Sequence, residues 1–412
     1  MAGGRKAGPK RAAAARDASL IDGVADWLMG QALAETEFEP LFEGCCERLL
    51  AAGVPLWRAH ATFRILHPLY EAMGLTWRRS QGVEIFRYPH RAVAEFPEAF
   101  MANPLHHLIQ TQLPSLRRRL TGPEALVDFP LLADLRDQGA SDYLAYLISF
   151  GAGELSGMVG SWATARRGGF TEGHLRALQR VQQRLGVACK MWLRGEIAKS
   201  VVATYLGPDA GLRVLDGQIR RGDGETVHAA IWYSDLRNST PLADRLPRDA
   251  FIQALNDYFE CAGGSVLRHD GQILNFIGDA VLAIFPTGKG VGARRACRRA
   301  LAAGKDAQAA LVTVNRRRAE LGQDQLSFGL ALHMGDVLLG NIGVPERISH
   351  SVIGATVNEV ARLEALTKKL KRPVVASGSF AAQAPGAWDD LGQHRLRGVK
   401  APLQVFAPVR ST

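Results

Sequence analysis

Hydrophobic positions in the middle of the chain repeat at helical spacing over a long stretch. Between residues 175 and 201 they recur mostly three or four apart, at Leu175, Leu178, Val181, Leu185, Ala188, Trp192, Ile197 and Val201. Such spacing puts them on one face of a helix, because an α-helix has about 3.6 residues per turn. The pattern predicts one long helix that either packs on its own domain or pairs with its copy in a second chain.

The segments before this helix change character twice. Residues 1–18 carry five basic residues and no large apolar side chain after the first methionine, which predicts a disordered basic tail. From Leu20 to about Pro97 apolar residues at helical spacing predict a mostly helical start. The runs DYLAYLISF and LSGMVGSWAT around a glycine-rich turn then predict a hairpin, after which Thr171 caps the long helix.

From about residue 100, the hairpin together with the helical segment GGFTEGHLRALQRVQQRL that follows it resembles the last strands and final helix of a GAF-type sensor domain. We therefore expect residues 19–174 to form an amino-terminal regulatory or sensor region. Gly207, Pro208, Gly211 and the run RRGDGE interrupt the helical pattern. They define residues 175–222 as a signalling helix and linker, and residues 223–412 as a final domain.

Strand-like and helical patterns alternate in this final domain. We expect a strand over 227–234, a helix over about 248–263, a hairpin over 271–285, a helix over about 292–319 and a strand over 326–333. The alternation predicts an α+β domain with an antiparallel sheet.

Two aspartates follow apolar strands in this domain. Asp235 ends the strand-like part of VHAAIWYSDLRNST, and small polar residues follow it. Asp279 belongs to the two-residue Gly-Asp turn of GQILNFIGDAVLAIF, the pattern of a tight hairpin. A carboxylate at a strand end beside free backbone N–H groups suits a metal-bound phosphate. Either aspartate alone is more often a cap or a turn residue, so the hypothesis depends on their context.

Four segments provide that context: SDLRNST, NFIGDAVLAIF, LALHMGDVLLGNIG and SVIGATVNEVARLEAL, in this order. Together they resemble the class III adenylyl and guanylyl cyclases, over nearly the whole of residues 220–410, and the preceding stretch is similar to bacterial members. The resemblance implies a ferredoxin-like βαββαβ core. It also implies that Asp235 and Asp279 hold two Mg²⁺ or Mn²⁺ ions, one activating the ribose 3′-hydroxyl and one steadying the triphosphate leaving group.

Asn358 and Arg362 are four residues apart in VNEVARL, so they share one face of a predicted helix. A guanidinium suits a pentavalent phosphate that gains negative charge. The resemblance implies that Arg362 stabilises the transition state and that Asn358 orients the ribose; without it, a plain surface pair would be the better interpretation. It also implies contacts to the triphosphate from a further set of residues: Arg237, Asn238, Ser239, Thr240, and Arg397 or Lys400.

The resemblance places purine recognition at Asn275 and Ser351. Adenylyl cyclases of this family usually carry Lys at the first position and Asp or Thr at the second. Lys only donates hydrogen bonds and suits N1 of adenine, whereas the Glu of guanylyl cyclases only accepts them and suits guanine; Asn and Ser do both. Asn275 and Ser351 therefore do not distinguish adenine from guanine. We favour ATP, converted to 3′,5′-cyclic AMP and pyrophosphate. The alternatives are a guanylyl or dual-specificity cyclase, or a degenerate cyclase domain acting as a nucleotide-binding regulatory module.

Composition limits the kinds of partner and the cellular location that we expect for this chain. The net charge of +10 comes from basic residues scattered among acids, with no nucleic-acid-binding motif, so we expect no nucleic-acid partner. No apolar run approaches the roughly 20 residues of a membrane span, which predicts a cytoplasmic protein. Five cysteines without a CxxC pair indicate neither a disulfide framework nor a structural zinc. The resemblance further implies a homodimer with active sites at its interface.

Overall fold

The structure is a computed structural model that describes residues 9–90, 101–151, 157–288 and 292–409. The chain divides into two compact units, Met1–Thr204 and Tyr205–Thr412, and each is described by itself.

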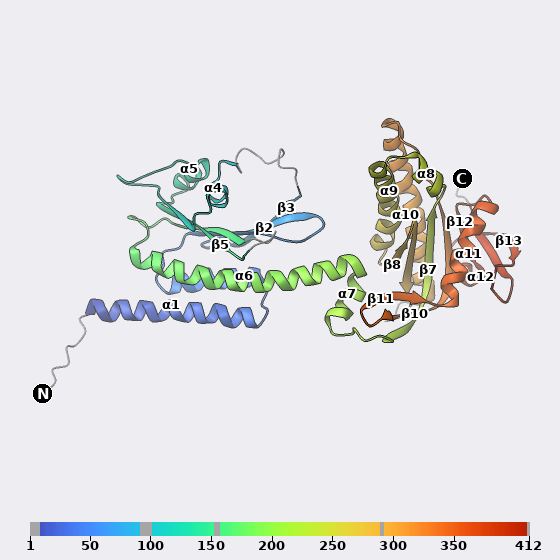
Figure 1. Ribbon diagram of the computed structural model, residues 1–412, viewed down its shortest axis with the longest axis horizontal. Coiled ribbons are helices and arrows are strands. Elements are labelled where there is room, and N and C mark those ends of the chain that lie inside the picture. The colour runs from blue at the N-terminus through green and yellow to red at the C-terminus, as the bar shows by residue number, and fades with distance from the viewer. Residues whose placement is uncertain (1–8, 91–100, 152–156, 289–291, 410–412) are drawn as a thin grey trace. The chain divides into compact units, whose positions relative to one another are not determined.

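The amino-terminal unit is built on a six-stranded antiparallel sheet with the order β3-β2-β1-β6-β5-β4. Its strands are β1 (Arg58–Arg64), β2 (Tyr70–Arg78), β3 (Gly82–Pro89), β4 (Ser115–Arg119), β5 (Asp142–Ser149) and β6 (Gly157–Thr164). Its helices are α1 (Pro9–Leu33), α2 (Phe38–Ala51), α4 (Pro104–Thr111), α5 (Pro130–Asp137) and most of α6 (Glu172–Leu206). Figure 1 shows α1 and α6 on one side of this sheet and α4 and α5 on the other.

Two predictions for this unit are confirmed. β5 and β6 pair as an antiparallel hairpin from Asp142 opposite Thr164 to Ser149 opposite Gly157. The long helix exists as α6, and its buried residues include Leu178, Val181 and Leu185 of the predicted apolar face. The likeness to a GAF-type sensor stays a prediction.

Two other expectations differ from the structure. Residues 9–18 form the first part of α1 instead of a disordered tail, because the run from Ala12 to Ala15 is a strong helix former; residues 1–8 lie outside the described residues. The helical start ends at Ala51, and the three strands β1 to β3 follow within the segment expected to be mostly helical. In β1 the burial alternates over Ala59–Phe63, a strand period that competed with the helical spacing.

The carboxyl-terminal unit contains the predicted core. Its strands are β7 (Gly224–Leu236), β8 (Gln272–Ile277), β9 (Ala280–Pro286), β10 (Phe328–Val344), β11 (Arg347–Ile353), β12 (Val374–Ser377), β13 (Trp388–His394) and β14 (Leu403–Pro408). Its helices are α7 (Pro208–Leu215), α8 (Ser239–Arg245), α9 (Arg248–Arg268), α10 (Ala293–Glu320), α11 (Ala355–Lys369) and α12 (Gly378–Ala381). The sheet order is β13-β14-β12-β10-β7-β9-β8, with β11 paired to β10. Within it, β10-β7-β9-β8 is the arrangement of a ferredoxin-like βαββαβ core, as predicted.

β7 is the central strand of this core and is buried on both faces. Ala230 and Trp232 pack in the cluster that contains α9 and α10, whereas Ala229 and Ile231 pack in the cluster that contains α11. Figure 1 shows these helices on opposite sides of the sheet. Because side chains alternate along a strand, Asp235 shares the face of Ile231, which α11 covers. None of the described helices is long and apolar enough to cross a membrane.

A buried ion pair joins the two helices on the opposite face. Asp257 of α9 is 4% exposed, and its Oδ2 lies 2.8 Å from Nη1 of Arg318, which is 2% exposed. Its Oδ1 lies 2.8 Å from Nη2 of Arg317, whose side chain is 58% exposed. The carboxylate therefore has one buried and one largely exposed cationic partner.

We predict that Asp257→Ala lowers the free energy of unfolding by about 3 to 5 kcal/mol, because Arg318 would keep a buried charge without its carboxylate. Arg317→Met should lower the free energy of unfolding by less than about 1 kcal/mol. The Arg317 side chain is largely exposed, and solvent weakens its ion pair with Asp257. Thermal and urea denaturation of the full chain would measure both values. If both variants lost the same free energy of unfolding, burial would not determine how much each ion pair contributes to stability.

Candidate functional site

Two aspartates come together where the central strand ends. Asp235 is the penultimate residue of β7 and pairs with Ala280, the first residue of β9. Asp279 precedes Ala280 in the turn between β8 and β9, and its backbone oxygen accepts a hydrogen bond from the Leu236 amide at 3.2 Å. Gly278 supplies the positive φ of +63° that this two-residue turn needs. Strand register therefore places the two predicted metal ligands side by side.

The electrostatics of this strand end favour a cation. Burial raises the pKa of Asp235 to about 7, and the charges of Asp279 and Glu364 and a hydrogen bond with Asp279 add to the increase, against the opposing charge of Arg237. Burial also raises the pKa of Glu364. Carboxylates this close repel one another when ionised, and divalent cations prefer oxygen ligands of this kind. The pair Asp235 and Asp279 thus fits one or two Mg²⁺ or Mn²⁺ ions.

A metal ion held by this pair would need further ligands. In the described part of the chain, no group of three or more His, Cys, Asp or Glu side chains is placed to hold a metal ion. The remaining ligands of a bound ion would then have to come from water or from a substrate, as is usual for Mg²⁺ at phosphate sites.

Asn358 and Arg362 lie one turn apart on α11, the helix over the Asp235 face of the sheet. Asn358 is exposed and Arg362 is partly exposed. A Cβ added to Gly398 would lie 3.1 Å from Nη1 of Arg362, so the guanidinium lies against the connection between β13 and β14. Arg397 and Lys400 are exposed in the same connection. Three basic side chains that were predicted to contact the substrate, those of Arg362, Arg397 and Lys400, therefore lie in one region.

The other predicted residues lie on separate elements. Asn275 is exposed on β8, the edge strand, beside an irregularity in its pairing with β9. Ser351 is half-buried on β11, opposite Gly340 of β10. Asn238 has a left-handed backbone at φ +57° and precedes α8, whose first two residues are Ser239 and Thr240.

The guanidinium of Arg237 is directed into its own unit. Its Nη2 donates a hydrogen bond to Oγ1 of Thr367 on α11 at 3.0 Å, and Thr367 donates one to Oε1 of Glu364 at 2.9 Å. Neither α11 residue was predicted as part of the site. Their spacing in the sequence is a signal that could have found them, because Val360, Glu364 and Thr367 recur at helical spacing. In the structure all three are buried on one face of α11, two of them with polar side chains.

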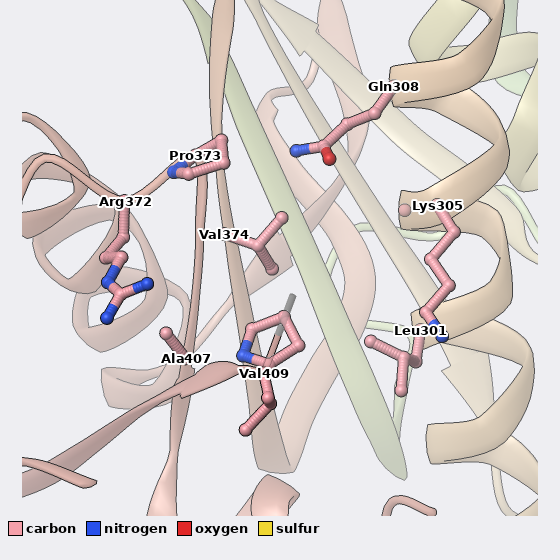
Figure 2. A pocket seen from close by; sticks show the side chains of 10 residues that line it. Leu301, Lys305, Gln308, Arg372, Pro373, Val374, Ala407 and Val409 are labelled. Atoms are coloured by element: carbon pink, nitrogen blue, oxygen red, sulfur yellow. The ribbon is translucent and has the colours of Figure 1, made fainter. Parts of the chain in front are cut away.

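A separate cavity of about 280 Å³ lies between α10 and the sheet, as Figure 2 shows. Lys305 and Gln308 of α10 line it together with Arg372, which pairs with Asp389 at 3.0 Å. None of its lining residues is a carboxylate, so it is distinct from the site around Asp235 and Asp279.

Comparison with known proteins gives matches to this unit. The family model described as adenylate and guanylate cyclase catalytic domain matches residues 224–402. The uncharacterized protein Rv1318c of Mycobacterium tuberculosis is 35% identical over 193 residues, which are 46% of this chain and 34% of that protein. An adenylate cyclase of Anabaena cylindrica is 33% identical over 155 residues, 37% of this chain and 30% of the relative. The chain spans about a third of the length of such curated relatives.

Two solved structures are similar to the same part of the chain. The adenylyl cyclase CyaB from P. aeruginosa is 23% identical with a TM-score of 0.42, covering 46% of this chain and 97% of its own. The guanylyl cyclase Cya2 is 29% identical with a TM-score of 0.39, covering 45% and 93%. With the βαββαβ core and the family match over residues 224–402, the carboxyl-terminal unit is a catalytic domain of the class III adenylate and guanylate cyclase family.

Proposed function

We propose that the chain is an adenylate cyclase that converts ATP to 3′,5′-cyclic AMP and pyrophosphate. The observation that carries this proposal is the register of β7 and β9, which sets Asp235 beside Asp279 at a strand end. In the reaction the ribose 3′-oxygen loses its proton to water and bonds to the α-phosphorus, while the bond from that phosphorus to the α,β-bridging oxygen breaks and pyrophosphate leaves. Bound Mg²⁺ or Mn²⁺ would make the ribose 3′-hydroxyl easier to deprotonate and would neutralise part of the negative charge of the triphosphate.

The protein's own groups hold and orient the reactants. Asp235 and Asp279 bind the cations and fix their position relative to the ends of β7 and the hairpin. Arg362 donates to the equatorial oxygens of the α-phosphate as their charge grows, and Asn358 holds the ribose. Arg397 or Lys400, in the connection next to Arg362, and the backbone at the start of α8 are suited to the triphosphate.

ATP is the proposed substrate because the relative from Anabaena cylindrica is named an adenylate cyclase and Ser351 can bond adenine as Thr does. Asn275 both donates and accepts, so a guanylate or dual-specificity cyclase is the alternative within the family. The retention of Asp235, Asp279, Asn358 and Arg362 argues against a degenerate, purely regulatory domain.

The enzyme is proposed to act as a homodimer, with the carboxylates of one chain facing Asn358 and Arg362 of the other. The amino-terminal unit is proposed to regulate it through α6, which runs from Glu172 to Leu206 and crosses the division at Thr204. Such coupling would require two arrangements of α6 that differ in the relative placement of the two catalytic units.

Asp235→Ala and Asp279→Ala should each lower the cyclisation rate by about a hundredfold or more, because each removes a ligand that positions the cations. Mn²⁺ should raise the Tm of the wild-type chain and have less effect on either variant. Chromatographic product assays and thermal denaturation would measure both. Asp209→Ala on α7, an exposed position, is the matched control. A folded variant of either ligand with near-normal rate would contradict the assignment.

Asn275→Lys should shift the ratio of ATP to GTP turnover toward ATP by roughly tenfold, because an ammonium offers only donors to the purine edge. Competition assays with both nucleotides would measure this ratio. Asn275→Ala is the control and should slow both reactions with a smaller change in their ratio. An unchanged ratio in the lysine variant would show that Asn275 does not face the base.

Mixed dimers test whether the sites are shared. Asp235→Ala and Arg362→Ala homodimers should be inactive, but a mixed dimer places both lesions in one site and leaves the other intact. With random exchange about half of the dimers are mixed, so activity should return to roughly a quarter of wild type. Native mass spectrometry of tagged chains would count the mixed dimers. Inactive mixtures that contain such dimers would exclude shared sites.

A further inference from the structure

Glu364 occupies a niche that the sheet leaves open beside Asp235. It is 9% exposed, and Thr367, one turn later on α11, is fully buried. A Cβ added to Gly329 of β10 would collide with Oε1 of Glu364 and lie 2.5 Å from Oγ1 of Thr367. Gly329 is the residue of β10 that pairs with Asp235. Two polar groups of α11 therefore pack directly on the backbone opposite the first metal ligand.

A chain of hydrogen bonds links this niche to the turn after Asp235. The Thr367 hydroxyl donates to Glu364 at 2.9 Å and accepts from Nη2 of Arg237 at 3.0 Å. The backbone amide of Arg237 donates to the oxygen of Ser327 at 2.8 Å. A hydroxyl that donates to a carboxylate becomes a better acceptor, so the two side-chain bonds strengthen each other. Arg237 is thus fixed at both its backbone and its guanidinium.

This arrangement gives Arg237 a different role from the one its sequence position implies. A guanidinium held by Thr367 inside its own unit has one edge committed to α11 instead of to a triphosphate. Its positive charge lowers the pKa of both Asp235 and Glu364, against the effect of their burial. The anchor fixes the strand-to-helix turn that begins one residue after Asp235 and leads into α8.

We propose that Glu364 is a positioning residue which, through the Thr367 hydroxyl, holds Arg237 and thereby fixes the orientation of the metal-binding Asp235. Glu364 touches neither substrate nor reacting atoms in this role. The effect on catalysis rests on the cyclase function proposed above, whereas the effect on the Arg237 turn does not depend on it.

Thr367→Val and Thr367→Ser form a matched pair for the test, because Val keeps the shape without the hydroxyl and Ser keeps the hydroxyl. Glu364→Gln removes the charge at nearly constant volume. In the whole chain without metal or nucleotide, Thr367→Val and Glu364→Gln should speed hydrogen exchange of the amides at residues 236–240 by roughly tenfold, while Thr367→Ser stays near wild type. Amides around Asp257 and Arg318, on the opposite face, are the internal control and should exchange at the wild-type rate.

With Mn²⁺ and ATP, Thr367→Val and Glu364→Gln should lower kcat roughly tenfold while KM for ATP changes by less than about twofold, and Thr367→Ser should recover most of kcat. Unchanged exchange at residues 236–240 in both Thr367→Val and Glu364→Gln would overturn the proposal, as would faster exchange throughout the unit, which would indicate a general packing role. If the wild-type chain formed no cyclic nucleotide, the proposed function would fail, but the exchange result would still decide the role of Glu364.

Discussion

The pairing of β7 on both of its edges is the constraint on which the catalytic unit depends. β9 and β10 bond to β7 along most of its length, and helices cover both of its faces. A strand held this way has no freedom to slip, because a shift by one residue would turn every buried side chain to the other face. The same register fixes where the strand ends. Asp235 and the Asp279 turn therefore meet as a consequence of core packing.

That meeting is unfavourable for the protein alone. Asp235 is half-buried beside Asp279, with Glu364 close enough to add to the rise in its pKa to about 7, and Arg237 is the cation that opposes this. Surplus negative charge in a partly desolvated place costs stability unless a cation binds. This electrostatic imbalance favours a bound divalent cation, as the proposed reaction requires.

Helix α11 packs on the sheet with one face and carries two of the proposed site residues on the other. Its inward stripe combines apolar contacts at Val360 and Leu363 with the polar pair Glu364 and Thr367, which contact Gly329 and Arg237. Its more exposed side carries Asn358 and Arg362, the latter beside Gly398. Packing of the first face thus sets the position of the second, so Glu364 and Thr367 influence where the two proposed catalytic residues lie.

The sequence alone determined the alternation of strands and helices between residues 227 and 333, because periods of two and of about 3.6 are visible in the chain itself. It also determined the four catalytic candidates, Asp235, Asp279, Asn358 and Arg362, through the order of their motifs. Local patterns misjudged the start of the chain, where alanines form a helix and β1 to β3 follow. Only the tertiary structure decided that Arg237 bonds Thr367 and that Glu364 packs on Gly329, the residue paired with Asp235, because both depend on the depth at which α11 packs over the sheet.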